Sequence, residues 1–154
     1  MRFRYNRDDD LNCRVLNYLE NGNIAMIKKL FEIGFLRHDD TFDITGRGIR
    51  GNPEDSETMM HIIARYETPN YKNLIDILLD YGANVNDGNI CTPLQTAIIY
   101  QNYSTAAYLM TKGGEYDIEQ VESYSKLAKI DLIKEVTKEC DILFADRTNL
   151  LYGE

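Results

Sequence analysis

The sequence predicts an all-α protein built as a stack of about four helix pairs. The first observation is a recurring interval of 19 residues, lengthened to 22 in the second unit, between an apolar residue of the first helix and the residue that closes the second. The second observation is that the closing helix of each unit carries apolar residues near i, i+1, i+4 and i+5, as a helix packed on neighbours requires. The intervals run over 15–34, 60–82, 94–113 and 121–140.

Composition agrees with one ordinary folded domain. The 154 residues are 44% hydrophobic and 27% charged. A chain of this length buries enough apolar surface to fold without disulfide bonds or bound metal ions. The net charge of -8 argues against a protein that binds nucleic acid through its phosphate backbone, because such binding depends on basic residues. A partner with a basic surface is electrostatically favoured.

The cysteines and the apolar runs bear on the compartment. Cys13, Cys91 and Cys140 are odd in number and widely spaced, which indicates neither a disulfide framework nor a zinc site. The longest apolar run is far shorter than a bilayer span, and no apolar region of a signal peptide follows the charged start. We therefore expect a cytoplasmic protein, in the producer or a host cell, with no membrane contact.

The helices are expected in order along the chain. The pairs fall near 11–20 with 23–33, 57–66 with 71–80, 93–101 with 104–112, and 118–128 with 130–139. Gly34, Gly82 and Gly113 are predicted to end three second helices in the left-handed conformation. Residues 36–56 lack helical periodicity, so we expect a long loop there, mobile or extended as a finger between Leu36 and Asn52.

Two motifs carry a family resemblance. The stretch Leu78–Asn86, with its Leu-Leu-Asp-Tyr-Gly-Ala-Asn-Val-Asn sequence, is followed by Thr92-Pro93-Leu94-Gln95-Thr96-Ala97. Together they resemble the ankyrin repeat, whose units open with "TPLHxA" and close with "LLxxGAxxN". In the second unit Thr58 and His61 are kept, while Met59 stands where the family has proline.

The resemblance implies one ankyrin-repeat solenoid over residues 1–154. Its repeats lie near 11–35, 57–86, 91–116 and 118–141, with the long loop 36–56 between the first two. The first and last units diverge from the motif, as end caps must, because a terminal repeat has one face against water. At His61 the family uses the imidazole to hydrogen-bond neighbouring turns, which favours a structural role over that of a general base.

The resemblance also implies where a partner binds. In this family the fingers between repeats and the exposed side of each first helix form a concave surface that binds other proteins. Tyrosine and arginine at such positions favour contact, because both bury large areas and keep a polar group available. Carried over by position, the partner-binding residues are Glu54, Asp55, Glu57, Arg65, Tyr66, Asp87, Asn89, Ile99 and Tyr100, with further loop contacts from Arg37, His38, Arg47 and Arg50.

A Gly-rich segment keeps one alternative open. Residues 46–51 satisfy GxGxxG, which in the right context lets the backbone approach a pyrophosphate at a helix N-terminus. The alternative function is therefore a nucleotide-binding or enzymatic protein that uses this loop, with Arg47, Arg50 and His38. The context is poor, because the stretch before the loop, Thr41-Phe42-Asp43-Ile44, is short and not continuously apolar, and the next helix belongs to the second repeat.

No set of residues indicates catalysis. His38 with Asp39, Asp40 and Asp43 lacks the spacing of a cation-binding loop, so we expect no metal site and no cofactor. The predicted function is a non-catalytic interaction module that binds and occupies a partner protein. An inhibitor, an adaptor, an immunity protein and a host-directed effector all fit this prediction, and the acidic run from Glu115 to Glu122 is a competing contact site.

Overall fold

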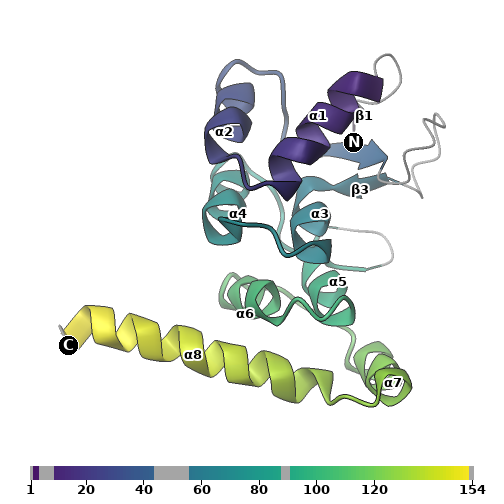
Figure 1. Ribbon diagram of the computed structural model, residues 1–154, viewed down its shortest axis with the longest axis vertical. Coiled ribbons are helices and arrows are strands. Elements are labelled where there is room, and N and C mark those ends of the chain that lie inside the picture. The colour runs from purple at the N-terminus through teal and green to yellow at the C-terminus, as the bar shows by residue number, and fades with distance from the viewer. Residues whose placement is uncertain (1, 4–8, 44–55, 88–90, 153–154) are drawn as a thin grey trace.

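The helices pair in sequence order and the pairs stack. The computed structural model describes residues 2–3, 9–43, 56–87 and 91–152. Figure 1 shows the first helices of the pairs following one another down one side of the stack and the second helices down the other. Within the described residues the pairs are α1 (Asp9–Glu20) with α2 (Ile24–Glu32), α3 (Met59–Arg65) with α4 (Tyr71–Asp80), α5 (Pro93–Ile99) with α6 (Tyr103–Thr111), and α7 (Ile118–Ala128) with α8 (Leu132–Tyr152).

The expected all-α stack is confirmed in the placement of the helices. Each of the eight observed helices overlaps the range that periodicity predicted for it. The predicted glycine turns are also present, since Gly34, Gly82 and Gly113 have φ values of 77°, 100° and 91°. These angles lie in the left-handed region, which glycine enters without steric penalty from a Cβ atom.

The fourth unit differs from the prediction at its end. Helix α8 does not stop near residue 139 but continues to Tyr152, so Cys140 lies inside the helix rather than at its close. The reason is that residues 139–143, Glu-Cys-Asp-Ile-Leu, contain no glycine to enter the left-handed conformation and no proline to interrupt the helix. Figure 1 shows the second half of α8 extending beyond α6.

The segment 36–56 is not simply a loop. Strand β2 (Asp40–Asp43) pairs in parallel with β1 (Arg2–Phe3) and antiparallel with β3 (Ser56–Thr58), which gives a three-stranded sheet in the order β1-β2-β3. Leu36 and Phe42 are 3% and 1% exposed. The expectation of a mobile finger is therefore wrong for residues 36–43, while residues 44–55, with the Gly-rich stretch, lie outside the described part of the chain.

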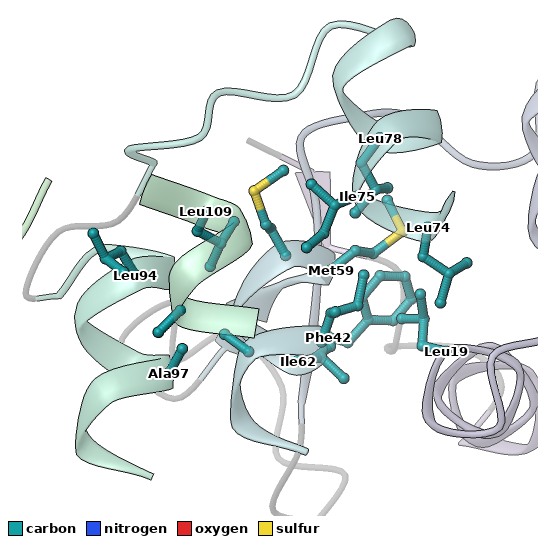
Figure 2. Packing of buried hydrophobic residues seen from close by; sticks show 14 of the residues in the cluster. Leu19, Phe42, Met59, Ile62, Leu74, Ile75, Leu78, Leu94, Ala97 and Leu109 are labelled. Atoms are coloured by element: carbon teal, nitrogen blue, oxygen red, sulfur yellow. The ribbon is translucent and has the colours of Figure 1, made fainter. Parts of the chain in front are cut away.

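The sheet closes one side of the hydrophobic core. Figure 2 shows Phe42 among side chains from three helices, with Leu19 of α1, Ile62 of α3 and Leu74 of α4 around its ring. All four side chains are buried, at 0–1% exposure. Burying one side chain of this size stabilises the fold by about 1.5–3 kcal/mol, so the strand joins the first and second units through the core.

Replacing Phe42 by Ala is expected to lower the free energy of unfolding by about 3–5 kcal/mol, because a large cavity would open between α1, α3 and α4. Urea denaturation measures the change. The matched control is Ile142→Ala, at a side chain that is 54% exposed, where the loss should stay below about 1 kcal/mol. Equal losses for the two variants would show that β2 is not part of the core.

Candidate functional site

The three first helices that follow the sheet begin in the same way. Thr58 and Thr92 cap α3 and α5, and their hydroxyl oxygens accept hydrogen bonds from the backbone N–H groups of His61 (3.3 Å) and Gln95 (3.2 Å). Asp117 caps α7 by accepting from the N–H groups of Glu119 and Gln120. An N-cap fixes the residue at which a helix starts, so these three helices start at equivalent positions in their units.

The His61 side chain joins the second unit to the third. Its Nε2 lies 2.7 Å from the carbonyl oxygen of Cys91, and its Nδ1 lies 2.6 Å from the hydroxyl oxygen of Thr58. A carbonyl only accepts, so Nε2 carries a proton, and in the neutral imidazole Nδ1 then accepts from the Thr58 hydroxyl. The imidazole therefore has both nitrogens engaged, as expected for a structural histidine rather than a general base.

Gln95 makes the equivalent connection between the third and fourth units. Its side-chain oxygen accepts from the backbone N–H of Asp117 at 2.7 Å, and its amide nitrogen donates to Gln120. Gln95 is 3% exposed, and its position three residues after the capping threonine is that of His61 in the preceding unit. An amide thus replaces the imidazole and still holds the next helix start in place.

The exposed ends of α3 and α5 carry the side chains available to a partner. Arg65 is the last residue of α3, Tyr66 follows it, and Tyr100 follows α5. Tyr66 is 38% exposed and Tyr100 is 49% exposed. Both rings therefore present apolar area and a hydroxyl group on the surface, in two adjacent units.

Arg65 is held between Glu57 and Tyr100. Its Nε donates to the carboxylate of Glu57 at 3.2 Å, and a second guanidinium nitrogen forms an ion pair with the other carboxylate oxygen. The guanidinium lies 4.5 Å from the centre of the Tyr100 ring and donates to its hydroxyl group. One arginine thus fixes the position of an exposed tyrosine from the neighbouring unit.

The charge on Arg65 is stabilised in this arrangement. Burial alone would lower the pKa of the guanidinium, but the hydrogen bond and negative charge of Glu57 outweigh it and raise the pKa. Because both side chains remain about one-fifth exposed, the pair contributes about 1 kcal/mol or less to stability. Its main effect is to restrict the rotamers of Arg65 and Tyr100 before any partner arrives.

Comparison with known protein families decides the classification. A family described as ankyrin repeats (3 copies) matches residues 15–120, which is more than half of the chain. The chain belongs to the ankyrin repeat family. Comparisons with curated proteins and with solved structures found no match.

Membership sets the general role of the surface. Ankyrin repeats are generally protein–protein interaction modules and are typically non-enzymatic. The match begins within α1 and ends at the start of α7, so most of the fourth helix pair lies outside it. This boundary agrees with the predicted divergence of the last repeat.

The ankyrin stack brings some of the predicted binding residues together and separates others. Glu57, Arg65 and Tyr100 are in direct contact, and Tyr66 adjoins them in sequence. Ile99 is half-buried. Predicted contacts Glu54, Asp55, Asn89, Arg47 and Arg50 fall outside the residues that the structure describes.

Asp87 and the loop residues Arg37 and His38 lie away from that cluster. Asp87 and His38 border the same small cavity beside Met59 and Leu78. The cavity encloses about 10 Å³, which corresponds to one water molecule and is far too small for a nucleotide. Arg37 is exposed, and its backbone N–H donates to the side chain of Asp40.

Sequence reasoning missed the mutual engagement of Glu57 and Arg65, which it treated as separate contacts for a partner. They lie eight residues apart, across the cap of α3, and only the folded turn brings their charges within reach. Sequence reasoning also missed Asn102, a buried residue whose amide donates to the carbonyl oxygens of Ala64 and Tyr66. No local periodicity indicates either interaction.

The described residues offer little for other chemistry. Burial raises the pKa of the Cys91 thiol, which disfavours the reactive thiolate. No group of three or more metal-ligating side chains is found in the described ranges. Within the same ranges, none of the helices has the length and apolar character needed to span a bilayer.

Replacing His61 by Ala is expected to lower the free energy of unfolding by about 1–3 kcal/mol, because the Cys91 carbonyl and the Thr58 hydroxyl would lose their shared partner. Thermal or urea denaturation measures this change. His38→Ala is the control, since His38 is exposed and the loss there should be below about 0.5 kcal/mol. Equal stability of the two variants would contradict the connecting role of His61.

Proposed function

We propose that this protein acts by binding and occupying a partner protein, without catalysis, through the free ends of its first helices. Family membership supports the general role, and the exposed pair Tyr66 and Tyr100 supports the location. The two tyrosines follow α3 and α5 at an interval of 34 residues, so successive units present the same kind of side chain.

The proposed location of the binding surface rests on the contacts by which Arg65 holds Tyr100 in place. An exposed aromatic side chain usually loses conformational entropy on binding, which reduces affinity. Here Arg65 already restricts the Tyr100 ring by a hydrogen bond and a cation–π contact, while half of the side chain stays exposed. A surface that is ordered in advance and still accessible is well suited to bind a protein partner.

Partner chemistry follows from charge. The net charge of -8 favours a protein with a basic surface and disfavours nucleic acid. Occupying such a partner would make the protein an inhibitor, an adaptor, an immunity protein or a host-directed effector in the cytoplasm of the producer or a host cell. The nucleotide-binding or enzymatic alternative rests on residues 46–51, and no contact of the described residues favours it.

Replacing Tyr66 and Tyr100 together by Ala is expected to weaken partner binding by about 2 kcal/mol or more, as for central interface aromatics. The partner is first captured with the intact chain from extracts of the native host or producer cell, and the dissociation constant is then measured with purified proteins. Circular dichroism confirms that the variant stays folded.

The control is Tyr81→Ala, because Tyr81 is 39% exposed but follows a second helix, α4. It should bind as the unchanged protein does. If the double tyrosine variant binds normally while Tyr81→Ala binds weakly, the partner occupies the second-helix side and the proposed location is wrong.

A further inference from the structure

Exposed large apolar side chains are found in the fourth unit as well as at Tyr66 and Tyr100 of the second and third units. Tyr124 and Leu127 on α7 are 39% and 81% exposed, and Leu127 is the most exposed of the large hydrophobic side chains in the described residues. Folded proteins rarely leave neighbouring large apolar side chains in water unless a partner covers them. The second, third and fourth units therefore each carry exposed large apolar side chains on or next to their first helices.

Helical geometry places these residues on the side of α7 that adjoins α5. Gln120 accepts a hydrogen bond from Gln95 of α5, so its side chain points toward that helix. Tyr124 and Leu127 follow Gln120 at i+4 and i+7, which puts all three on one stripe of the helix surface. Val121, about 100° farther round the helix, is fully buried and lies off this stripe, in the core of the stack.

Charge distinguishes this end of the surface from the second unit. Glu115, Asp117, Glu119 and Glu122 are exposed at the start of α7, and none of them forms an ion pair with another residue of the described ranges. In the second unit, by contrast, the carboxylate of Glu57 is neutralised by Arg65. The start of α7 thus carries carboxylates without ion-pair partners among the described residues, while the basic residues of this helix, Lys126 and Lys129, lie at its other end.

The spacing lets one ligand use both features. At a rise of about 1.5 Å per residue, Glu119 precedes Tyr124 by about 7.5 Å along α7 and precedes Leu127 by about 12 Å. A lysine or arginine side chain spans a length comparable to the first of these distances, and a segment lying along α7 covers the second. The acidic run from Glu115 to Glu122 and the exposed tyrosines are suggested by the sequence as competing sites. They are therefore parts of one surface.

We propose that α5 and α7 form a docking site for a basic amphipathic segment of the partner protein. This inference rests on the proposed function. Apolar side chains of that segment lie on Tyr100, Tyr124 and Leu127, and its lysine or arginine side chains meet the carboxylates at the start of α7. A second copy of this chain is a poorer occupant, because a symmetric contact would bring acidic residues against acidic residues.

A display selection tests the chemistry of this segment. Random 16-residue peptides are selected on the intact chain, the enriched peptides are synthesised, and their dissociation constants are measured by fluorescence anisotropy at low and high salt. We expect enriched peptides with net positive charge and apolar residues, and binding that weakens with salt. Enrichment of acidic or uncharged peptides, or of none, would overturn the inference.

Variants locate the contact. Leu127→Ser combined with Tyr124→Ser should weaken binding about tenfold or more, whereas Ile33→Ser, at a 67% exposed site in the first unit, should leave it unchanged. Glu119→Lys combined with Glu122→Lys should weaken binding and reduce its salt dependence. The matched charge control is Glu32→Lys combined with Asp80→Lys, at exposed positions on α2 and α4.

The outcomes separate this inference from the proposed function. If the enriched peptides lose binding in the Tyr66 and Tyr100 double variant but not in the α7 variants, the α7 site is wrong and the first-helix surface stands. If binding changes only in the charge control on α2 and α4, the α7 site and the proposed first-helix location are both wrong. Circular dichroism on each variant shows that a loss of binding is not a loss of fold.

Discussion

The buried amide of Asn102 holds the end of α3, and the proposed binding surface depends on that contact. A helix leaves its last carbonyl groups without partners inside the helix. Asn102 is the N-cap residue of α6, but its side chain makes no capping hydrogen bond there. Instead its amide nitrogen donates to the backbone carbonyl oxygens of Ala64 (3.1 Å) and Tyr66 (2.9 Å) in the preceding unit. The third unit therefore fixes the segment that carries Arg65 and Tyr66.

A chain of contacts leads from this amide to the proposed partner. With the end of α3 in place, Arg65 reaches back to Glu57 and across to Tyr100. Through Gln95, α5 in turn fixes the start of α7 and thereby the stripe that carries Tyr124 and Leu127. Each unit positions part of the surface of the next, so the surface is ordered only when the units are stacked in register.

The repeated core was predictable from sequence because its signals are local. Apolar spacing located the helix pairs, and glycines located three of their ends, since a left-handed turn has a strong residue preference. The fourth end could not be found in this way, because Cys140 occupies the position of a glycine while the helix continues to Tyr152. The sheet was missed because two- to four-residue strands are too short to show alternation, and β1 and β2 pair across more than thirty residues.

The site was predicted less completely than the core. The predicted placement of Arg65, Tyr66 and Tyr100 at the ends of the first helices is confirmed, because the repeat register determines those positions, while their role in binding stays a prediction. The pairing of Glu57 with Arg65 and the place of Tyr124 and Leu127 depend on how neighbouring units meet, which sequence spacing does not specify. Every predicted partner contact remains a prediction, and five of them, Glu54, Asp55, Asn89, Arg47 and Arg50, lie outside the described residues.

Urea unfolding of Asn102→Ala tests most directly whether contacts between units hold the surface in place. The account predicts a loss of about 1–3 kcal/mol, because two backbone carbonyls at the end of α3 would lose their buried donor. The matched change Asn73→Ala, at an exposed position on α4, should cost less than about 0.5 kcal/mol. An Asn102→Ala variant as stable as Asn73→Ala would contradict the account.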